Sequence, residues 1–262
     1  MKTSTIDKLK SIKANGNKFA AITAYDFSFA ALIEAAEIEV TLVGDSLGNV
    51  IQGQDTTIPV SVDEMAYHTA NVRRAINHSL LVSDMPFMSY STVPQALENA
   101  ATLMQAGAQM VKLEGGEWLV DTVYALTERG VPVCGHLGLT PQSVHKLGGY
   151  KVQGKQEHEA KTMLADAKML EEAGADLIVV ECVPSSLGKA LAAALEIPVI
   201  GIGAGPDTDA QVLVLHDMLG ISSKLPKFSK NFLEQADSIQ SALSNFRNDV
   251  HNGKFPSTEH CF

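Results

Sequence analysis

Cysteine is scarce in this sequence, long apolar stretches are absent, and positive charge is in the minority. Only three cysteines occur, Cys134, Cys182 and Cys261, without a C-x-x-C pair. This pattern excludes a disulfide framework and argues against a structural zinc site. No uncharged run reaches membrane-spanning length, and the first residues contain no apolar core of signal-peptide length. We therefore expect a cytoplasmic protein.

The charge balance is acidic, with 20 Lys and Arg against 30 Asp and Glu and a formal net charge of −10. Such a chain repels nucleic acid and anionic lipid, so we expect neither as a partner. The 262 residues, 45% of them hydrophobic, suffice for one large core. No linker or low-complexity tract interrupts the chain, which predicts a single domain over residues 1–262.

Short apolar runs rich in β-branched residues alternate with longer segments of helical period. Eight runs are candidate strands: 19–25, 40–45, 80–84, 110–115, 131–137, 176–182, 198–203 and 212–217. Strands that are apolar on both faces and alternate with helices indicate a parallel sheet covered by helices. Eight such units predict an α/β fold, the (β/α)8 TIM barrel. A doubly wound open sheet is the alternative.

Three further segments lie outside this alternation. Residues 4–14 have the period of an amphipathic helix, with Ser4 as its expected N-cap. The chain after about residue 220 predicts a basic loop, a C-terminal helical extension and a polar tail. The long polar segment 140–160 is typical of a lid or binding loop.

Four of the apolar runs end on an acid: Asp45, Asp84, Glu114 and Glu181. An isolated buried charge is costly, so each acid needs a partner, water or a cation. In a barrel the carboxyl ends of the strands meet around one opening. We therefore expect these four acids to converge.

Three carboxylates brought together repel one another unless a cation offsets them. Oxygen-only donors suit Mg²⁺ better than zinc. We therefore expect Asp45, Asp84 and Glu114 to surround Mg²⁺. Each acid alone also fits a helix cap or a turn.

Three polar residues lie beside these acids. Lys112 shares a strand face with Glu114, which predicts pairing with the acids and binding of a substrate carboxylate. A Schiff base or a structural ion pair are its alternatives, but neighbouring acids make the free amine scarce. His136 in "CGHLGL" fits a neutral imidazole that donates to a carbonyl or carboxylate, or a structural histidine. Ser46 offers its hydroxyl to an anion or caps a helix.

Glu181 follows the apolar run "LIVV". Apolar surroundings raise the pKa of a carboxyl group, which suits a general base. The alternative is a partnered buried acid. "GIGAG" lacks the last glycine of a dinucleotide fingerprint, so it is better interpreted as a turn at the barrel opening.

Many motifs in one order carry a family resemblance between about residues 18 and 233. The chain resembles the ketopantoate hydroxymethyltransferase family, also called 3-methyl-2-oxobutanoate hydroxymethyltransferase, in "TAYD", "VGDSLG", "DMPF", "VKLEGG", "VCGHLGLTPQS", "GGYKVQG", "ECVP", "IPVIGIGAG" and "PKFSKNF". The resemblance implies a (β/α)8 barrel that forms a homo-oligomer, a decamer, and acts in pantothenate biosynthesis, on the coenzyme A pathway.

The resemblance also implies a reaction and its residues. A hydroxymethyl group passes from the co-substrate 5,10-methylenetetrahydrofolate to 3-methyl-2-oxobutanoate and gives 2-dehydropantoate. The oxo acid chelates Mg²⁺, the proton acceptor removes the C3 proton, and the enolate attacks the one-carbon unit. The implied roles are Asp45, Asp84 and Glu114 on the metal; Asp45, Ser46, Asp84, Lys112 and His136 on the oxo acid; and Glu181 as proton acceptor.

Two rival functions remain at this stage. One is a metal-dependent 2-oxo acid aldolase or lyase of the phosphoenolpyruvate mutase–isocitrate lyase type, which shares the barrel and the acids. The other is a non-catalytic protein on the same barrel. Dependence on methylenetetrahydrofolate separates the first rival from the hydroxymethyltransferase.

Overall fold

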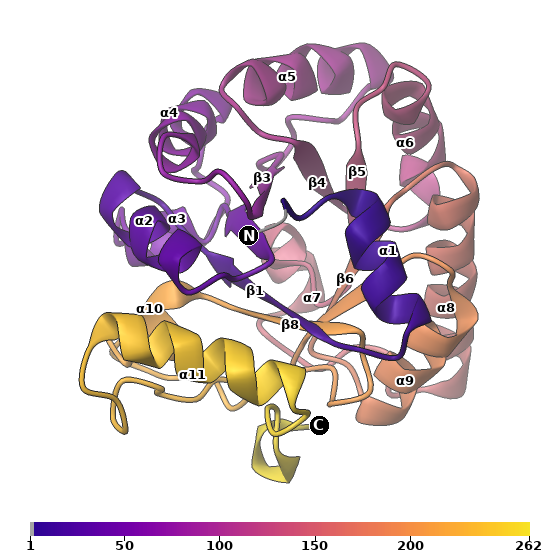
Figure 1. Ribbon diagram of the computed structural model, residues 1–262. Coiled ribbons are helices and arrows are strands. Elements are labelled where there is room, and N and C mark those ends of the chain that lie inside the picture. Colours follow the sequence, from indigo (N-terminus) through magenta and orange to yellow (C-terminus); the bar gives the residue numbers. More distant parts are fainter. Residues whose placement is uncertain (1–2) are drawn as a thin grey trace.

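Eight parallel strands close into a barrel in chain order, with β1 paired to both β2 and β8 (Figure 1). The structure is a computed structural model that describes residues 3–262. The closed barrel confirms the predicted (β/α)8 fold and excludes the open sheet. The strands are β1 Phe19–Thr23, β2 Val40–Val43, β3 Leu80–Asp84, β4 Met110–Glu114, β5 Val133–Gly138, β6 Leu177–Glu181, β7 Val199–Ile202 and β8 Ala210–Leu213.

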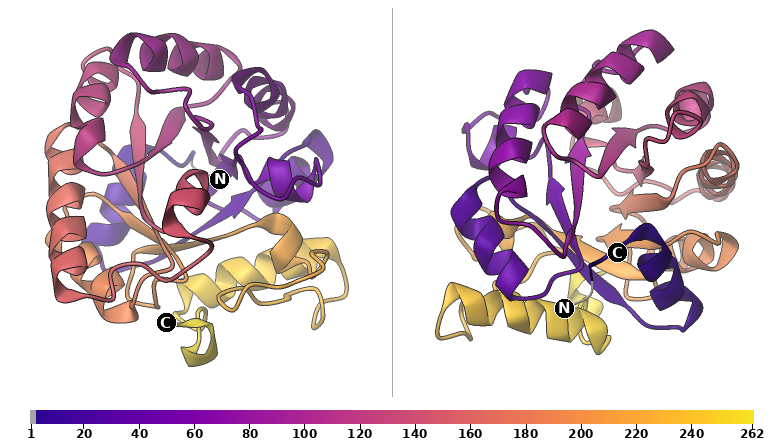
Figure 2. Two further views of the ribbon diagram at one scale, coloured as in Figure 1. Left: turned by 180° about the vertical axis from the view of Figure 1, so that it is seen from behind. Right: turned by 45° about the horizontal axis from the view of Figure 1, so that its top comes forward.

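Helices surround the barrel on its outer side (Figure 2). Local sequence sets where they start: Ser61 and Glu64 form a capping box for α4, and Thr92 caps α5. None of the described helices is long and apolar enough to cross a membrane. The helices are α1 Ile6–Ala14, α2 Phe27–Ala35, α3 Leu47–Val50, α4 Val62–Arg73, α5 Val93–Gln105, α6 Val120–Thr127, α7 Val144–Leu147, α8 Glu157–Glu172, α9 Ser185–Ala194, α10 Leu215–Met218 and α11 Ile239–His251, with 3-10 turns η1 Glu117–Leu119, η2 Pro141–Ser143 and η3 Thr258–His260.

Alternate side chains of each strand enter two different apolar layers. On β1, Ala20 and Ile22 pack in the layer between strands and helices, whereas Phe19 and Ala21 pack inside the barrel. The lower barrel is therefore a filled core, and a polar site can form only at its upper end, where the strands finish.

Helix α1 covers the opposite end of the barrel, where the strands begin. Leu9 is fully buried against the interior layer, and Lys13 Nζ lies 2.9 Å from Asp209 Oδ2 just before β8. The N-terminal helix is thus present as predicted, but its cap is Thr5, whose hydroxyl accepts from the Lys8 N–H. The expected cap, Ser4, is instead buried, and its N–H donates to the His78 carbonyl.

The last strand and the C-terminal segment differ from the sequence expectation. Strand β8 begins at Ala210 and ends at Leu213, and the chain then turns into α10. The apolar pattern did not predict the start of β8, because Gln211 is a polar residue in the strand. Its side chain is nevertheless buried, since its amide donates to Gly205 O and Thr208 Oγ1. The extension does contain the predicted helix, α11, but the tail is anchored: Phe255 is buried against Phe232.

Candidate active site

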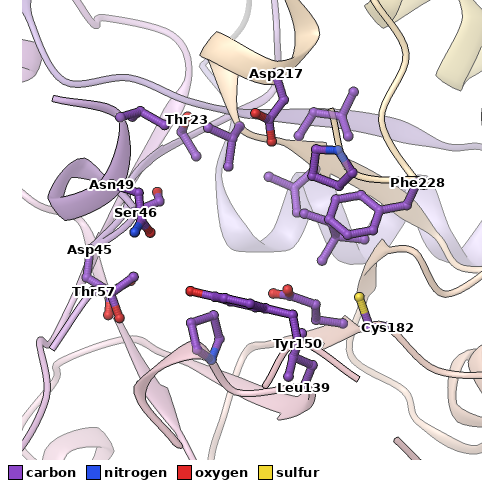
Figure 3. Close-up of a pocket in the computed structure, with 18 of the residues that line it drawn as sticks. Thr23, Asp45, Ser46, Asn49, Thr57, Leu139, Tyr150, Cys182, Asp217 and Phe228 are labelled. Atoms are coloured by element: carbon purple, nitrogen blue, oxygen red, sulfur yellow. The ribbon is translucent and has the colours of Figure 1, made fainter. Parts of the chain in front are cut away.

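The four strand-end acids line one cavity of about 800 Å³ at the upper end of the barrel. They come from the ends of β2, β3, β4 and β6, and Figure 3 shows Asp45 and Ser46 on one side of the cavity with Cys182 and Tyr150 across it. The structure therefore brings together all seven residues singled out in the sequence: Asp45, Ser46, Asp84, Lys112, Glu114, His136 and Glu181.

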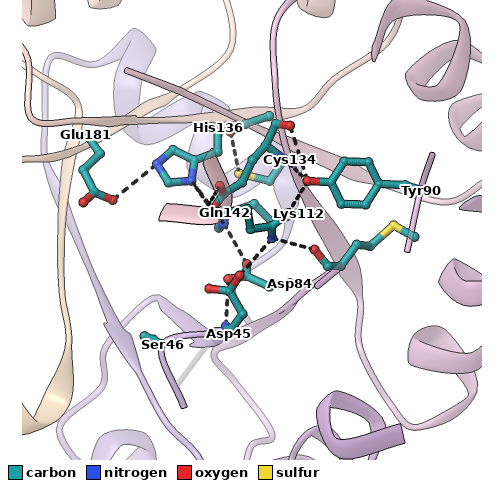
Figure 4. A network of polar contacts seen from close by, with 12 residues as sticks. Asp45, Ser46, Asp84, Tyr90, Lys112, Cys134, His136, Gln142 and Glu181 are labelled. Atoms are coloured by element: carbon teal, nitrogen blue, oxygen red, sulfur yellow. Dashed lines mark hydrogen bonds and ion pairs between the residues drawn. The ribbon is translucent and has the colours of Figure 1, made fainter. Parts of the chain in front are cut away.

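Lys112 is the cation at the centre of the group (Figure 4). Asp84 and Lys112 are register partners on β3 and β4, and Lys112 Nζ lies 2.9 Å from Asp84 Oδ1 and 3.8 Å from Glu114 Oε1. Burial lowers the pKa of Lys112, but these carboxylates and Asp45 outweigh it and raise that pKa well above 10.5. Lys112 is therefore an ammonium group, which disfavours a Schiff-base role.

Asp45 and Asp84 are joined through the turn that follows β2. The Asp45 N–H donates to Asp84 Oδ2 over 3.1 Å. Gly44 leaves room in this turn for the Ser46 hydroxyl, since a Cβ at Gly44 would lie 2.8 Å from Ser46 Oγ. Burial and then the Glu114 and Asp84 carboxylates raise the pKa of Asp45 well above 3.8. Burial also raises the pKa of Asp84, despite its contact with Lys112.

Glu114 stays ionised more readily than these two aspartates. Its Oε2 accepts from the Gln142 N–H at 3.0 Å, and its Oε1 lies 3.3 Å from His136 Nδ1. Burial alone would raise its pKa, but His136, Lys112 and the Gln142 N–H together hold the pKa of Glu114 below 4.5. The three expected metal ligands thus differ in their readiness to lose a proton.

His136 lies between two carboxylates, one at each ring nitrogen. Its Nε2 is 3.4 Å from Glu181 Oε2, and its Nδ1 faces Glu114. Burial and Lys112 lower the pKa of His136, but Glu114 and Glu181 outweigh them and raise it to about 9. The two carboxylates therefore favour the protonated ring, against the opposing charge of Lys112, whose Nζ also lies 3.3 Å from His136 Nδ1.

Ser46 precedes α3 but makes no side-chain cap for that helix. Its hydroxyl instead pairs with Tyr25 OH at 2.8 Å. Tyr25 is buried, and burial raises its pKa well above 10. Ser46 Oγ is therefore held in place at the cavity wall by a neutral phenol.

Gln142 is a further site residue, one that was not predicted from the sequence. Its Nε2 donates to Asp45 Oδ2 at 2.8 Å and to Met85 O at 2.9 Å, and its Oε1 accepts from Tyr90 OH. Gln142 stands in η2, not at a strand end, so the strand-end rule could not find it. The only available signal was its place in the motif "GLTPQS".

The donor atoms of this group fit a hard divalent cation, although their present arrangement is not a finished metal site. No three His, Cys, Asp or Glu side chains within residues 3–262 are already grouped as metal ligands. The carboxylates of Asp45, Asp84 and Glu114 are nonetheless crowded and buried. Moreover, Glu114 Oε1 is enclosed without a well-aligned hydrogen bond. Crowded carboxylate oxygens of this kind are Mg²⁺-type donors.

A closed eight-stranded α/β barrel with ionisable side chains at its strand ends defines a barrel enzyme. A family model described as ketopantoate hydroxymethyltransferase matches residues 3–258. The chain belongs to this family. It is 59% identical to 3-methyl-2-oxobutanoate hydroxymethyltransferase of Shewanella halifaxensis, over 98% of both chains, and 56% identical to that of Alteromonas mediterranea, over the full length of both.

Solved structures of lower identity share the fold. A phosphonomutase-like protein from Burkholderia cenocepacia has a TM-score of 0.64 at 16% identity, covering 83% of this chain and 95% of that one. Phosphonopyruvate hydrolase, solved with oxalate and Mg²⁺, has a TM-score of 0.63 at 13% identity, covering 98% and 93%. At these identities the solved structures show only that the fold is shared, and they do not support the lyase alternative. The family model matches residues 3–258, which favours the hydroxymethyltransferase.

Proposed function

We propose that this chain transfers a hydroxymethyl group from 5,10-methylenetetrahydrofolate to 3-methyl-2-oxobutanoate and gives 2-dehydropantoate. The observation that carries the proposal is the convergence of Asp45, Asp84, Glu114 and Glu181 with Lys112 on one cavity, in a chain of this family.

The metal ligands in this proposal are Asp45, Asp84 and Glu114. Their donor chemistry suits Mg²⁺, and the structurally similar phosphonopyruvate hydrolase was solved with Mg²⁺ and oxalate, a chelating acid. When bound, Mg²⁺ polarises the keto oxygen of a chelating oxo acid and makes the adjacent C–H acidic. We also assign Asp45, Ser46, Asp84, Lys112 and His136 to binding of the oxo acid.

The cations and hydroxyl of the site have positioning roles in this scheme. The Lys112 ammonium and the His136 imidazolium attract the substrate carboxylate and the oxygen on which negative charge develops. The Ser46 hydroxyl, anchored on Tyr25 at 2.8 Å, donates to the same anionic group. Lys112 and His136 are buried, so the attraction of their charges is little screened by water.

Glu181 is the general base of the proposal. Its side chain is 13% exposed and borders the cavity, and its Oε2 faces His136 Nε2. Its other oxygen, Oε1, therefore receives the C3 proton. Segment 140–160, which contributes Pro141 and Tyr150 to the cavity wall, limits access of water to the carbanion that forms.

The direct test is a transfer assay with purified protein, 3-methyl-2-oxobutanoate and 5,10-methylenetetrahydrofolate. We expect 2-dehydropantoate, identified by mass spectrometry, only when both substrates and Mg²⁺ are present. Cleavage or formation of a carbon–carbon bond without folate would instead indicate the aldolase or lyase reaction.

We further propose that the chain is one domain, works in the cytoplasm and assembles as a homo-oligomer, the decamer that the family resemblance implies. Residues 1 and 2 of the predicted domain lie outside the described part. Large apolar side chains at the surface, Trp118 at 61% and Tyr124 at 57% exposure, are of the kind that subunit interfaces cover. Light scattering of the purified protein tests the subunit number.

A further inference from the structure

The cavity is larger than a small oxo acid requires. Its volume of about 800 Å³ falls in the range of roughly 300–1,000 Å³ that encloses drug-sized ligands. The acids, Lys112 and His136 account for the inner part, at the strand ends. The outer part is lined by residues that the proposed chemistry of the oxo acid does not use, among them Tyr150, Asp217, Lys227, Phe228 and Phe262.

Asp217 is the buried acid of this outer part. The residue is 7% exposed and lines the cavity, and Figure 3 shows its carboxylate directed into the open space, near Thr23. Its side chain bonds to Ser222, and burial raises its pKa above 3.8. Within residues 3–262, no Lys, Arg or His side chain forms an ion pair with it. A buried acid without a cation is costly, and its remaining acceptor capacity faces the cavity.

Asp217 is held firmly by its surroundings. The N–H of Leu215, in the same short helix α10, donates to Thr23 Oγ1 at 2.9 Å. After the helix, the N–H of Phe232 donates to Met218 O at 2.8 Å. The carboxylate is therefore presented by a backbone that is anchored on β1 and on the C-terminal segment, which is the kind of support that a binding group needs.

Aromatic rings form the adjacent wall. Phe228 and Phe262 both lie against Gly203 at the end of β7, where an added Cβ would be 3.0 Å from each ring. Phe262 is fixed by its carbonyl, which accepts from the Ser185 N–H at 3.0 Å, and Lys227 Nζ stands 4.8 Å from its ring centroid. An apolar aromatic wall beside a buried acceptor suits a flat heterocycle with N–H donors on its edge.

We propose that Asp217 binds the aminopyrimidinone edge of the folate co-substrate and so orients its reactive end toward the oxo acid. This inference rests on the proposed function. The 2-amino group and the neighbouring ring N–H of such a heterocycle form a pair of adjacent donors, and a carboxylate has two oxygens that accept them side by side. Phe228 and Phe262 supply the apolar wall for the ring.

The first test compares Asp217→Asn with wild-type protein, using the exposed Asp207→Asn as the matched control. Binding of tetrahydrofolate is measured by calorimetry, and exchange of the C3 proton of 3-methyl-2-oxobutanoate is measured in deuterated water with Mg²⁺ and no folate. We expect Asp217→Asn to weaken tetrahydrofolate binding by at least about tenfold, with an exchange rate like that of wild type. The Asp207→Asn control should change neither.

A ligand-side comparison keeps the inference testable even where the variant is less stable. An analogue of tetrahydrofolate with a methyl group in place of the 2-amino group should bind wild-type protein at least about tenfold more weakly than tetrahydrofolate. Asp217→Asn should show little of that difference, because the contact is then already lost.

The outcomes separate this inference from the function on which it rests. Equal tetrahydrofolate binding by Asp217→Asn and wild type, or loss of exchange with unchanged folate binding, would overturn the role of Asp217. Absence of exchange in wild-type protein would instead count against the proposed reaction, while the two binding comparisons would still decide whether Asp217 contacts the heterocycle.

Discussion

The amide of Gln142 donates a hydrogen bond of 2.8 Å to Asp45 Oδ2, although the two residues are 97 positions apart in sequence. Through its own N–H, Gln142 also holds Glu114 Oε2 at 3.0 Å. One residue in the segment after β5 thus fixes the orientation of two acids that come from the ends of β2 and β4. Groups that orient metal-ligating carboxylates are expected to matter nearly as much as the ligands.

Substituting Gln142 by Leu should therefore lower transfer activity by roughly 10–100-fold. It leaves Asp45 Oδ2 and Met85 O without the Gln142 amide that they accept from, at an expected cost of about 1–3 kcal/mol in unfolding free energy. Tyr90 OH keeps its contact with Glu114 O at 3.3 Å. Activity at saturating Mg²⁺ and chemical denaturation measure the two effects. Gln105→Leu, on the exposed face of α5, is the control. Wild-type activity in a folded Gln142→Leu protein would contradict the orienting role.

Asp45 should make the metal-free protein less stable at neutral pH. Its folded pKa lies above 3.8, so the folded state disfavours the ionised form. The penalty is absent below pH 3.8 and is complete once the pH exceeds the raised value. With EDTA present, the unfolding free energy of Asp45→Asn should then exceed that of wild type by ~1–2 kcal/mol near about pH 8. This difference should shrink as the pH falls toward about 4.

Thermal unfolding of both proteins across that pH range measures the difference. Asp207→Asn, whose aspartate side chain is 50% exposed, should show no such gain. An Asp45→Asn protein that is less stable than wild type at neutral pH in EDTA would show that the carboxylates are not in electrostatic conflict.

His136 should titrate well above an ordinary histidine. Its folded pKa is about 9 against 6.5, because Glu114 and Glu181 favour the imidazolium. The stability that this charge contributes is fully present below pH 6.5 and is lost as the pH rises through about 9. NMR of the ring in metal-free protein should give a midpoint near 9, and Glu181→Gln should lower it. A midpoint near 6.5, or one shifted equally by the exposed Glu234→Gln, would refute this arrangement.

Much of the fold could be predicted because strands that are buried on both faces have a strong apolar signal. The run "LIVVE" shows this: its first four residues are buried strand, and Glu181 ends the strand. The eighth strand was misplaced because buried Gln211 has no apolar signature, and its partners, Gly205 O and Thr208 Oγ1, are found only in three dimensions.

The same distinction applies to the site. Asp45, Asp84, Glu114 and Glu181 could be found because the barrel brings the ends of all strands to one opening, so position in the sequence predicts position in space. Gln142 could not, since it lies in the 3-10 turn η2 beyond the end of β5. Asp217 ends the predicted run 212–217 but was not singled out, and the structure places it in the short helix α10 after β8. The charge of His136 was also beyond sequence reasoning, because it depends on which carboxylates face its two nitrogens.

The central claim is that Glu181 removes the C3 proton of an oxo acid held by the other strand-end acids with Mg²⁺. Exchange of that proton in deuterated water, followed by NMR, tests it most directly. Wild-type protein and the exposed-site control Glu128→Gln should exchange the proton, whereas Glu181→Gln or wild type with EDTA should be slower by at least about 100-fold. Exchange at the wild-type rate in Glu181→Gln, or exchange that survives EDTA and leaves a borohydride-trapped adduct on Lys112, would contradict the account.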